Sequence, residues 1–221
     1  MLNLLFPKVC NGCKDLLSAS ETVLCTHCRH HLPLVCHHRN DNDAMKKMLY
    51  GRVPIANATA LLQFQKKGIT QEILHNLKYR KQEEVSFFFG KWLGAELAET
   101  PAYNQIDVVI PVPLHKKKEK KRGYNQVTGF GKEIAKALKV SYYDDILLKI
   151  SNTNSQVFKK RLTRFGANEV FALDRPAALE NAHVLLVDDI VTTGATLESC
   201  ASQLLKAKNV TISLATIAIT L

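Results

Sequence analysis

Two adjacent acids follow an apolar run in "HVLLVDDIVTTGATLESC", which spans His183 to Cys200. Aspartate is a poor strand residue and is costly to bury unpaired, so Asp188 and Asp189 either cap a strand or form a functional site. The next residues, "TTGAT", lie where the strand turns into a helix, and exposed backbone N–H groups at such a turn bind phosphate. Acids beside a phosphate suit a ligand that also offers hydroxyl groups or Mg²⁺, such as a sugar phosphate.

Four cysteines near the start form two C-x₂-C pairs, "CNGC" and "CTHC", separated by eleven residues. Four thiolates at this spacing close a tetrahedral Zn²⁺ site. All four ligands come from the protein, so the zinc is expected to be structural and to supply folding energy on the order of 10 kcal/mol. The predicted ligands are Cys10, Cys13, Cys25 and Cys28.

Other cysteine and histidine residues have less regular spacing. A second metal site would have to use Cys36, His30, His31, His37 and His38. Because their spacing is irregular, we expect surface residues there instead. Cys200 is expected to be a small buried apolar residue. No partner is evident for His75, His115 or His183, although His115 lies beside a basic run.

The formal net charge is +10, and the stretch "KKKEKKR", Lys116 to Arg122, holds six cations and one acid. Such a concentration favours an anionic ligand, either a polyphosphate or a nucleic-acid backbone; the alternative is a solvated loop. No apolar run reaches the roughly 18 residues of a membrane span, and the first residues lack the features of a secretory signal. We therefore expect a cytoplasmic protein whose cysteines bind metal instead of forming disulfides.

The chain divides into a cysteine module, residues 1–40, and an α/β domain, residues 41–221. Helices are predicted at 68–81, 83–99, 125–139 and 192–208, and strands at 106–112, 144–150, 183–189 and 210–220. Asn125 is expected to cap its helix. Strands that alternate with helices indicate a parallel sheet flanked by helices, and the carboxyl ends of such strands bind ligands. A receiver-like or hydrolase α/β domain also places acids there, but it does not predict "TTGAT".

The stretch "VLLVDDIVTTGATL" closely resembles the phosphoribosyl-diphosphate signature of type I phosphoribosyltransferases. The resemblance implies that Asp188 and Asp189 hold the ribose hydroxyls, that Mg²⁺ accompanies the ligand, and that the following loop binds the 5′-phosphate. The loop residues are Thr192, Thr193, Gly194, Ala195 and Thr196.

The same resemblance gives roles to two further stretches. The loop "PVPLHKKKEKKRGYNQ" would contact the diphosphate, with Lys117, Lys118 and Arg122 as candidate residues. The polar stretch "TNSQVFKKRLTRFGAN" would be the flexible catalytic loop, with Gln156, Arg161 and Arg164 as candidate catalytic residues beside the two acids. Such a loop closes over the substrate and excludes water.

These stretches together with "LKYRK" resemble the ComF group of competence proteins, which carry an N-terminal zinc ribbon. Ser151 and Asn168 depart from the pattern of that group. The resemblance implies natural transformation and, as partners, phosphoribosyl diphosphate, single-stranded DNA and a competence helicase.

Two functions of different class remain open. One is an enzyme, a Mg²⁺-dependent phosphoribosyltransferase with an unidentified nitrogen acceptor. The other is a non-catalytic protein that handles single-stranded DNA through the basic run, with affinity that falls as salt rises.

Overall fold

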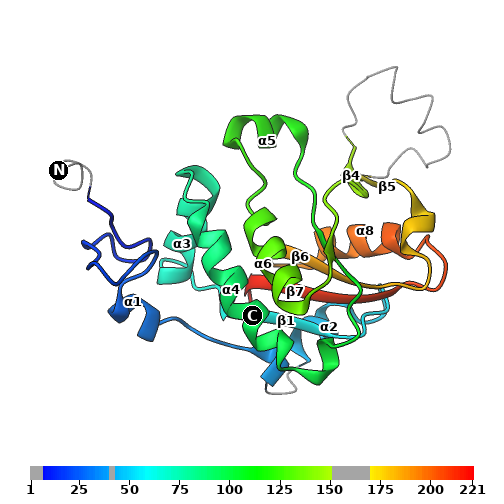
Figure 1. Cartoon of the computed structure of the whole chain (residues 1–221), viewed down its shortest axis with the longest axis horizontal. Coiled ribbons are helices and arrows are strands. Elements are labelled where there is room, and N and C mark those ends of the chain that lie inside the picture. The colour runs from blue at the N-terminus through cyan, green and yellow to red at the C-terminus, as the bar shows by residue number, and fades with distance from the viewer. Residues whose placement is uncertain (1–6, 40–42, 151–169) are drawn as a thin grey trace.

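The computed structural model of the chain describes residues 7–39, 43–150 and 170–221. A five-stranded sheet of order β1-β7-β6-β2-β3 lies at its centre, and all of its neighbouring strands are parallel (Figure 1). This confirms the predicted parallel α/β architecture. The strands are β1 (Ala58–Gln63), β2 (Val108–Pro111), β3 (Ser141–Tyr142), β6 (His183–Val191) and β7 (Thr211–Ile219).

Helices cover both faces of the sheet, as parallel strands require. Side chains of β6 alternate between two buried clusters. Leu185 and Val187 pack in the cluster formed with α3, α4 and α6, whereas Val184 and Leu186 pack in the cluster formed with α2 and α8. The helices are α1 (Thr26–His30), α2 (Ala44–Leu49), α3 (Ile69–Tyr79), α4 (Glu84–Ala98), α5 (Lys116–Arg122), α6 (Thr128–Leu138) and α8 (Ala195–Leu204).

Short elements complete the fold. Strands β4 (Leu147–Lys149) and β5 (Phe171–Leu173) pair antiparallel in a separate two-stranded sheet, so the strand predicted at 144–150 exists but lies outside the main sheet. The 3₁₀ helices are η2 (His37–Arg39), η3 (Pro101–Tyr103) and η4 (Pro176–Leu179). None of the helices in residues 7–39, 43–150 and 170–221 has the length and apolar character that a membrane crossing requires.

Two local predictions are wrong. The basic run is helix α5 and not a loop, because His115 Nδ1 accepts a hydrogen bond from Lys117 N (3.1 Å) at its start and Gly123 ends it in the left-handed conformation. The second error concerns Asn125, which does not cap α6. Its Oδ1 accepts from Val127 N (3.3 Å), and its Nδ2 donates to Val112 O (3.1 Å), so it fixes the turn before the helix.

The cysteine module packs directly on α3. Cys10, Leu24 and Cys28 belong to the same buried cluster as the α3 side chains. Polar contacts add to this packing: Asn76 Nδ2 of α3 donates to Asn11 O (3.0 Å), and Lys14 pairs with Glu72 (3.2 Å). The module and helix α3 therefore share one core.

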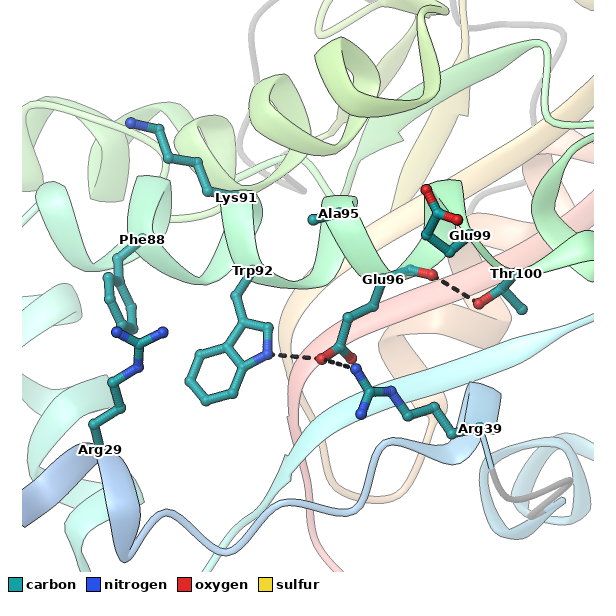
Figure 2. A pocket seen from close by; sticks show the side chains of 9 residues that line it. All are labelled: Arg29, Arg39, Phe88, Lys91, Trp92, Ala95, Glu96, Glu99 and Thr100. Carbon is teal, nitrogen blue, oxygen red and sulfur yellow. Dashed lines mark hydrogen bonds and ion pairs between the residues drawn. The ribbon is translucent and has the colours of Figure 1, made fainter.

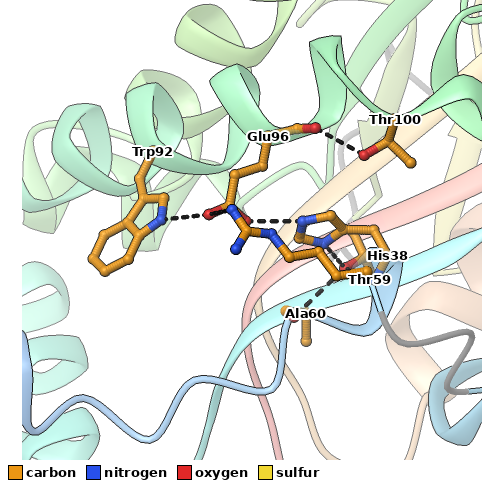
Figure 3. A network of polar contacts seen from close by, with 7 residues as sticks. His38, Thr59, Ala60, Trp92, Glu96 and Thr100 are labelled. Atoms are coloured by element: carbon orange, nitrogen blue, oxygen red, sulfur yellow. Dashed lines mark hydrogen bonds and ion pairs between the residues drawn. The ribbon is translucent and has the colours of Figure 1, made fainter.

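A second link joins η2 to α4 through Glu96, whose side chain is 11% exposed (Figure 3). Its carboxylate accepts from His38 Nε2 (2.8 Å), Arg39 Nη2 (2.6 Å) and Trp92 Nε1 (2.8 Å). The other ring nitrogen of His38 lies 2.8 Å from Thr59 Oγ1, so a neutral imidazole satisfies both contacts. The carboxylate thus ties the last residues of the cysteine module to helix α4.

The predicted surface position of the residues near the end of the cysteine module is wrong for three of them. Cys36 and His37 are buried, and the side chain of His38 has no exposed surface. They are buried because η2 packs against β1, a strand that we did not predict. His30 and His31 are exposed, as expected. His183, for which no partner was evident, lies 2.8 Å from Ser213 Oγ through Nε2.

Burial of His37 makes stability depend on pH. Within the described part of the chain, neither ring nitrogen of His37 has a hydrogen-bond partner. Burial lowers the pKa of His37 below its usual value, and the charge of His38 lowers it further. A depressed histidine pKa contributes stability that is present above about pH 6.5 and is lost as the pH falls through the folded-state pKa.

We therefore expect His37→Leu to raise the free energy of unfolding by about 1–3 kcal/mol at pH 7, because it removes an unsatisfied buried polar group. The variant should also lose less stability than the wild type between pH 8 and 6. Urea unfolding at both pH values, with zinc present, measures this. His75→Leu changes an exposed histidine and is the control. Equal pH dependence in the His37 variant and the wild type would contradict the assignment.

Candidate ligand site and metal centre

The acid pair lies inside β6 and not at its end. The ladder continues past Asp188 and Asp189, since Ile190 and Val191 still pair with β7. The prediction that the acids end the strand is therefore wrong by two residues. Both side chains are nonetheless buried at the carboxyl half of a parallel strand, which is where α/β folds bind ligands.

The two carboxylates face opposite sides of the sheet, because neighbouring strand residues alternate. Asp188 faces the α8 layer, where its charge raises the pKa of Cys200 after the larger effect of burial. Asp189 faces the α3 layer, and its Oδ2 lies 2.8 Å from Lys78 Nζ. Sequence reasoning missed Lys78, because nothing in the stretch "LKYRK" marks which cation will reach an acid more than a hundred positions away.

Asp188 is held in an environment that opposes its ionisation. Burial first, and the charge of Asp189 second, raise its pKa well above the usual range. The N–H of Asp189 donates to Asp188 Oδ1 (2.8 Å), and this bond together with the charge of Lys78 favours the ionised form. Two adjacent buried acids with a single bound lysine make a site that would gain from further hydroxyl donors or from a cation.

The loop after β6 has the features of an anion-binding turn. Gly194 adopts the left-handed conformation (φ 77°) and precedes α8, whose first N–H groups have no partner within the helix. Thr192, Thr193, Ala195 and Thr196 are exposed, whereas Gly194 is buried. Arg52, which follows α2, holds this loop from outside: its Nη1 donates to Thr193 O (3.0 Å) and to Glu198 Oε2 (3.2 Å).

We expect Gly194→Ala to lower the free energy of unfolding by about 2–4 kcal/mol, from left-handed strain and from overpacking. A Cβ at this position would lie 2.8 Å from Leu49 Cδ2. Gly51→Ala is a matched control, because Gly51 has φ 73° and nothing within 4 Å of its added Cβ, so it should show the strain alone. Chemical denaturation of the two variants measures the difference. Equal losses in both would contradict the packing of the loop on α2.

The basic helix begins at the same edge of the sheet. Val112, just after β2, donates its N–H to Val187 O (2.8 Å), so the chain that leads into α5 starts beside the acid pair. Lys117 and Lys118 lie exposed on α5, and Figure 1 shows this helix standing above α6. Arg122 turns inward: it donates to Gln126 Oε1 (2.6 Å) and lies 5.4 Å from the ring centre of Tyr79. Gln156, Arg161 and Arg164 lie outside the described residues.

The four predicted cysteine ligands meet at one point. Their sulfur atoms all lie within 4.8 Å of one another, and the sulfur atoms of Cys13 and Cys25 are 3.7 Å apart. A tetrahedral Zn–S site with bonds of about 2.3 Å requires sulfur atoms about 3.8 Å apart, so the residues fit this ion. Backbone N–H groups of Gly12 and Cys25 donate to Cys10 Sγ, and such bonds orient a metal-binding sulfur.

Glu21 supports the second cysteine pair and was missed by sequence reasoning. Its carboxylate accepts from the N–H groups of Ser18 (2.8 Å) and Thr26 (2.5 Å), and these bonds lower its pKa to about 2. An S/T-rich stretch before "CTHC" gives only a weak signal for this role. In the part of the chain that the structure describes, Cys36 and the histidines near it join no group of three or more potential metal ligands.

Two sizeable pockets lie elsewhere. One, of about 1180 Å³, lies between α2 and the start of β7. The other, of about 710 Å³, lies between the cysteine module and α4 (Figure 2), and Arg29 there lies 5.4 Å from the ring centre of Trp92. Neither of these two pockets is lined by the acid pair.

Comparison with known proteins agrees with this geometry. Residues 127–219 match the phosphoribosyl transferase domain family, and this range contains both acids and the loop. Competence protein ComFC of Bacillus subtilis (strain 168) is 26% identical over 204 residues, which cover 90% of this chain and 78% of ComFC. DNA utilization protein YhgH of Escherichia coli O157:H7 is 28% identical over 138 residues.

The match to YhgH covers 61% of this chain, and it spans only 60% of the length of YhgH. Among solved structures, glutamine phosphoribosylpyrophosphate amidotransferase from B. subtilis, complexed with ADP and GMP, is similar with a TM-score of 0.42 and 20% identity. That similarity covers 63% of this chain and 30% of the amidotransferase.

The parallel sheet, the acid pair with its loop, and the matched domain define a phosphoribosyltransferase-like protein. Two further observations distinguish the chain within this class: the N-terminal cysteine cluster and the similarity to ComFC, which covers 90% of the chain. The chain is similar to ComFC over most of its length and has the domain of a phosphoribosyltransferase-like protein.

Proposed function

We propose that the chain binds phosphoribosyl diphosphate with Mg²⁺ at the acid pair and transfers the phosphoribosyl group to a nitrogen acceptor. The observation that carries this proposal is the pair of buried acids on β6, followed within a few residues by the left-handed Gly194 and the start of α8. A sugar phosphate offers hydroxyl donors to the acids and an anion to the loop.

Each part of the site then has a task. Asp188 and Asp189 accept hydrogen bonds from the ribose hydroxyls, while backbone N–H groups at the start of α8 hold the 5′-phosphate. Arg122, Lys117 and Lys118 stabilise the diphosphate as its bond to the sugar carbon breaks. Magnesium, when bound, would neutralise part of the charge on that leaving group. The acceptor nitrogen forms the new bond and loses its proton.

The stretch that holds Gln156, Arg161 and Arg164 is proposed as the loop that covers the reacting centre. Water would otherwise compete with the acceptor as a nucleophile. We assign these residues to that loop by their place in the chain, between β4 and β5.

A turnover assay tests the proposed reaction. The zinc-loaded chain is incubated with phosphoribosyl diphosphate, Mg²⁺ and a panel of purine, pyrimidine and amine acceptors, and released diphosphate is measured. We expect release that depends on one class of acceptor. Tight ligand binding without release for any acceptor would contradict transfer and leave a binding protein.

We propose that residues 1–40 form a structural zinc module and that residues 41–221 form the phosphoribosyltransferase-like domain. The cysteine geometry supports the first part, and the continuous sheet supports the second. The cytoplasm, where thiols stay reduced, is the compartment that suits such a module.

The names of the relatives, competence protein and DNA utilization protein, support a link to DNA uptake. A second candidate function is therefore the handling of single-stranded DNA, together with a competence helicase. The observation that favours it is the basic helix α5, which has no buried residue. Cations presented in this way bind phosphates with affinity that falls steeply as salt rises.

Changing residues 116–118 of α5 to Ala tests the second candidate. Binding of a single-stranded oligonucleotide at low salt should weaken, and added diphosphate should compete if one helix serves both ligands. Unchanged oligonucleotide affinity in this variant would contradict it.

A further inference from the structure

Lys78 supplies the positive charge that the acid pair needs, and it comes from outside the matched domain. Its Nζ lies 2.8 Å from Asp189 Oδ2, with 23% of the lysine side chain and 5% of the aspartate side chain exposed. Charges this far from water are retained when they compensate one another. Lys78 therefore neutralises a carboxylate that we assign to ligand binding.

The residues on either side of Lys78 contact other parts of the molecule. Asn76 donates to Asn11 O of the cysteine module (3.0 Å), and Leu77 O accepts from the hydroxyl of Tyr124. Tyr79 lies under the guanidinium of Arg122, at the end of the basic helix (5.4 Å). The lysine is thus held at the point where the cysteine module, the basic helix and the acid pair meet.

Lys78 contacts the Asp189 carboxylate, which is also the group that a bound ribose would contact. A carboxylate only accepts hydrogen bonds, and both the ammonium group and a sugar hydroxyl donate them. A ribose hydroxyl that approaches Asp189 Oδ2 therefore competes with Lys78 for that oxygen. The displaced ammonium stays beside the ligand, and a buried cation is costly unless it finds another anion.

We propose that Lys78 is a ligand-exchange residue: it pairs with Asp189 in the empty site and moves to the diphosphate group when phosphoribosyl diphosphate binds. The inference rests on the proposed function and adds to it a residue that specifies the diphosphate. Ribose 5-phosphate has the same hydroxyls and the same 5′-phosphate but no diphosphate on its sugar carbon. Comparing the affinities of the two ligands therefore separates the effect of competition at Asp189 from the affinity gained at the diphosphate.

The experiment is calorimetric titration of the full zinc-loaded chain with each ligand in the presence of Mg²⁺. Lys78→Met should weaken phosphoribosyl diphosphate by about 10- to 100-fold, the usual effect of losing a hydrogen bond to a charged group. The same variant should bind ribose 5-phosphate as well as the wild type or better. Lys78→Arg should restore most of the diphosphate affinity. Lys81→Met, an equal change of charge at an exposed residue, should match the wild type for both ligands.

Equal weakening of both ligands by Lys78→Met would show a merely structural lysine and overturn the inference. Unchanged affinity for phosphoribosyl diphosphate would overturn it as well. In both cases the wild type still binds, and the proposed function stands. A wild-type chain that binds neither ligand would instead remove the proposed function, and the inference with it.

Discussion

The double substitution of Asp188 and Asp189 by Asn is expected to weaken binding of phosphoribosyl diphosphate by about 10²- to 10⁴-fold. Each carboxylate accepts a hydrogen bond from a ribose hydroxyl, and a hydrogen bond to a charged group contributes about 1.5–3 kcal/mol. Calorimetric titration of the full chain with the ligand and Mg²⁺ measures the change. Unchanged binding would show that the acids do not hold the ligand.

Thermal unfolding of the variant is measured beside binding, because Asp189→Asn leaves Lys78 without its anion, whereas the change at Asp188 should be tolerated. Because burial raises the pKa of Asp188, its stabilising form is the protonated one, which is fully present at low pH and lost as the pH rises through the folded-state pKa. Asn imitates that neutral form at every pH. The double substitution of Asp144 and Asp145 by Asn is the control, because these adjacent acids are exposed before β4. It should bind like the wild type.

Removal of zinc is expected to have the largest effect on stability. Cys28→Ser removes one of four ligands, and a structural zinc site contributes on the order of 10 kcal/mol to folding. The variant should contain less than one zinc per chain by elemental analysis. It should also lose its thermal transition at moderate temperature, because Cys28 belongs to the core that the module shares with α3.

A second cysteine provides the control for this experiment. Cys200 is buried in α8 and belongs to the other core cluster. Cys200→Ser should lower the free energy of unfolding by about 1–3 kcal/mol, since it buries a hydroxyl, and should keep one zinc per chain. A Cys28→Ser variant that retains full zinc and full stability would contradict the metal centre.

Local patterns were sufficient to predict much of the site. Adjacent acids, a threonine-glycine turn and two cysteine pairs each carry their chemistry within a few residues, and the structure brings the four cysteines together as predicted. The parallel sheet also followed from local periodicity. Gln156, Arg161 and Arg164 lie outside the described residues, and their roles stay predictions.

The features that sequence reasoning missed depend on tertiary contacts. Lys78 meets Asp189 because α3 packs on the face of β6 to which odd-numbered side chains point. His37 and His38 are buried because η2 packs on a strand, β1, whose signal was weak. Helix α5 forms although its cations repel one another, with His115 and Gly123 at its two ends. No window of a few residues contains this information.

Helix α3 connects the cysteine module with the candidate ligand site. It shares a core with the cysteine module, and it carries the lysine that pairs with the acid on β6. A structural metal in the cysteine module can therefore support a ligand site on β6 through the packing of α3.

The central claim is that the acids on β6 and the loop after them together bind a sugar phosphate. A crystal structure of the full chain with phosphoribosyl diphosphate and Mg²⁺ tests it most directly. The account predicts ribose hydroxyls within about 3 Å of Asp188 and Asp189, and the 5′-phosphate on the N–H groups that follow Gly194. A ligand bound elsewhere, with Lys78 still paired to Asp189 and the loop empty, would contradict it.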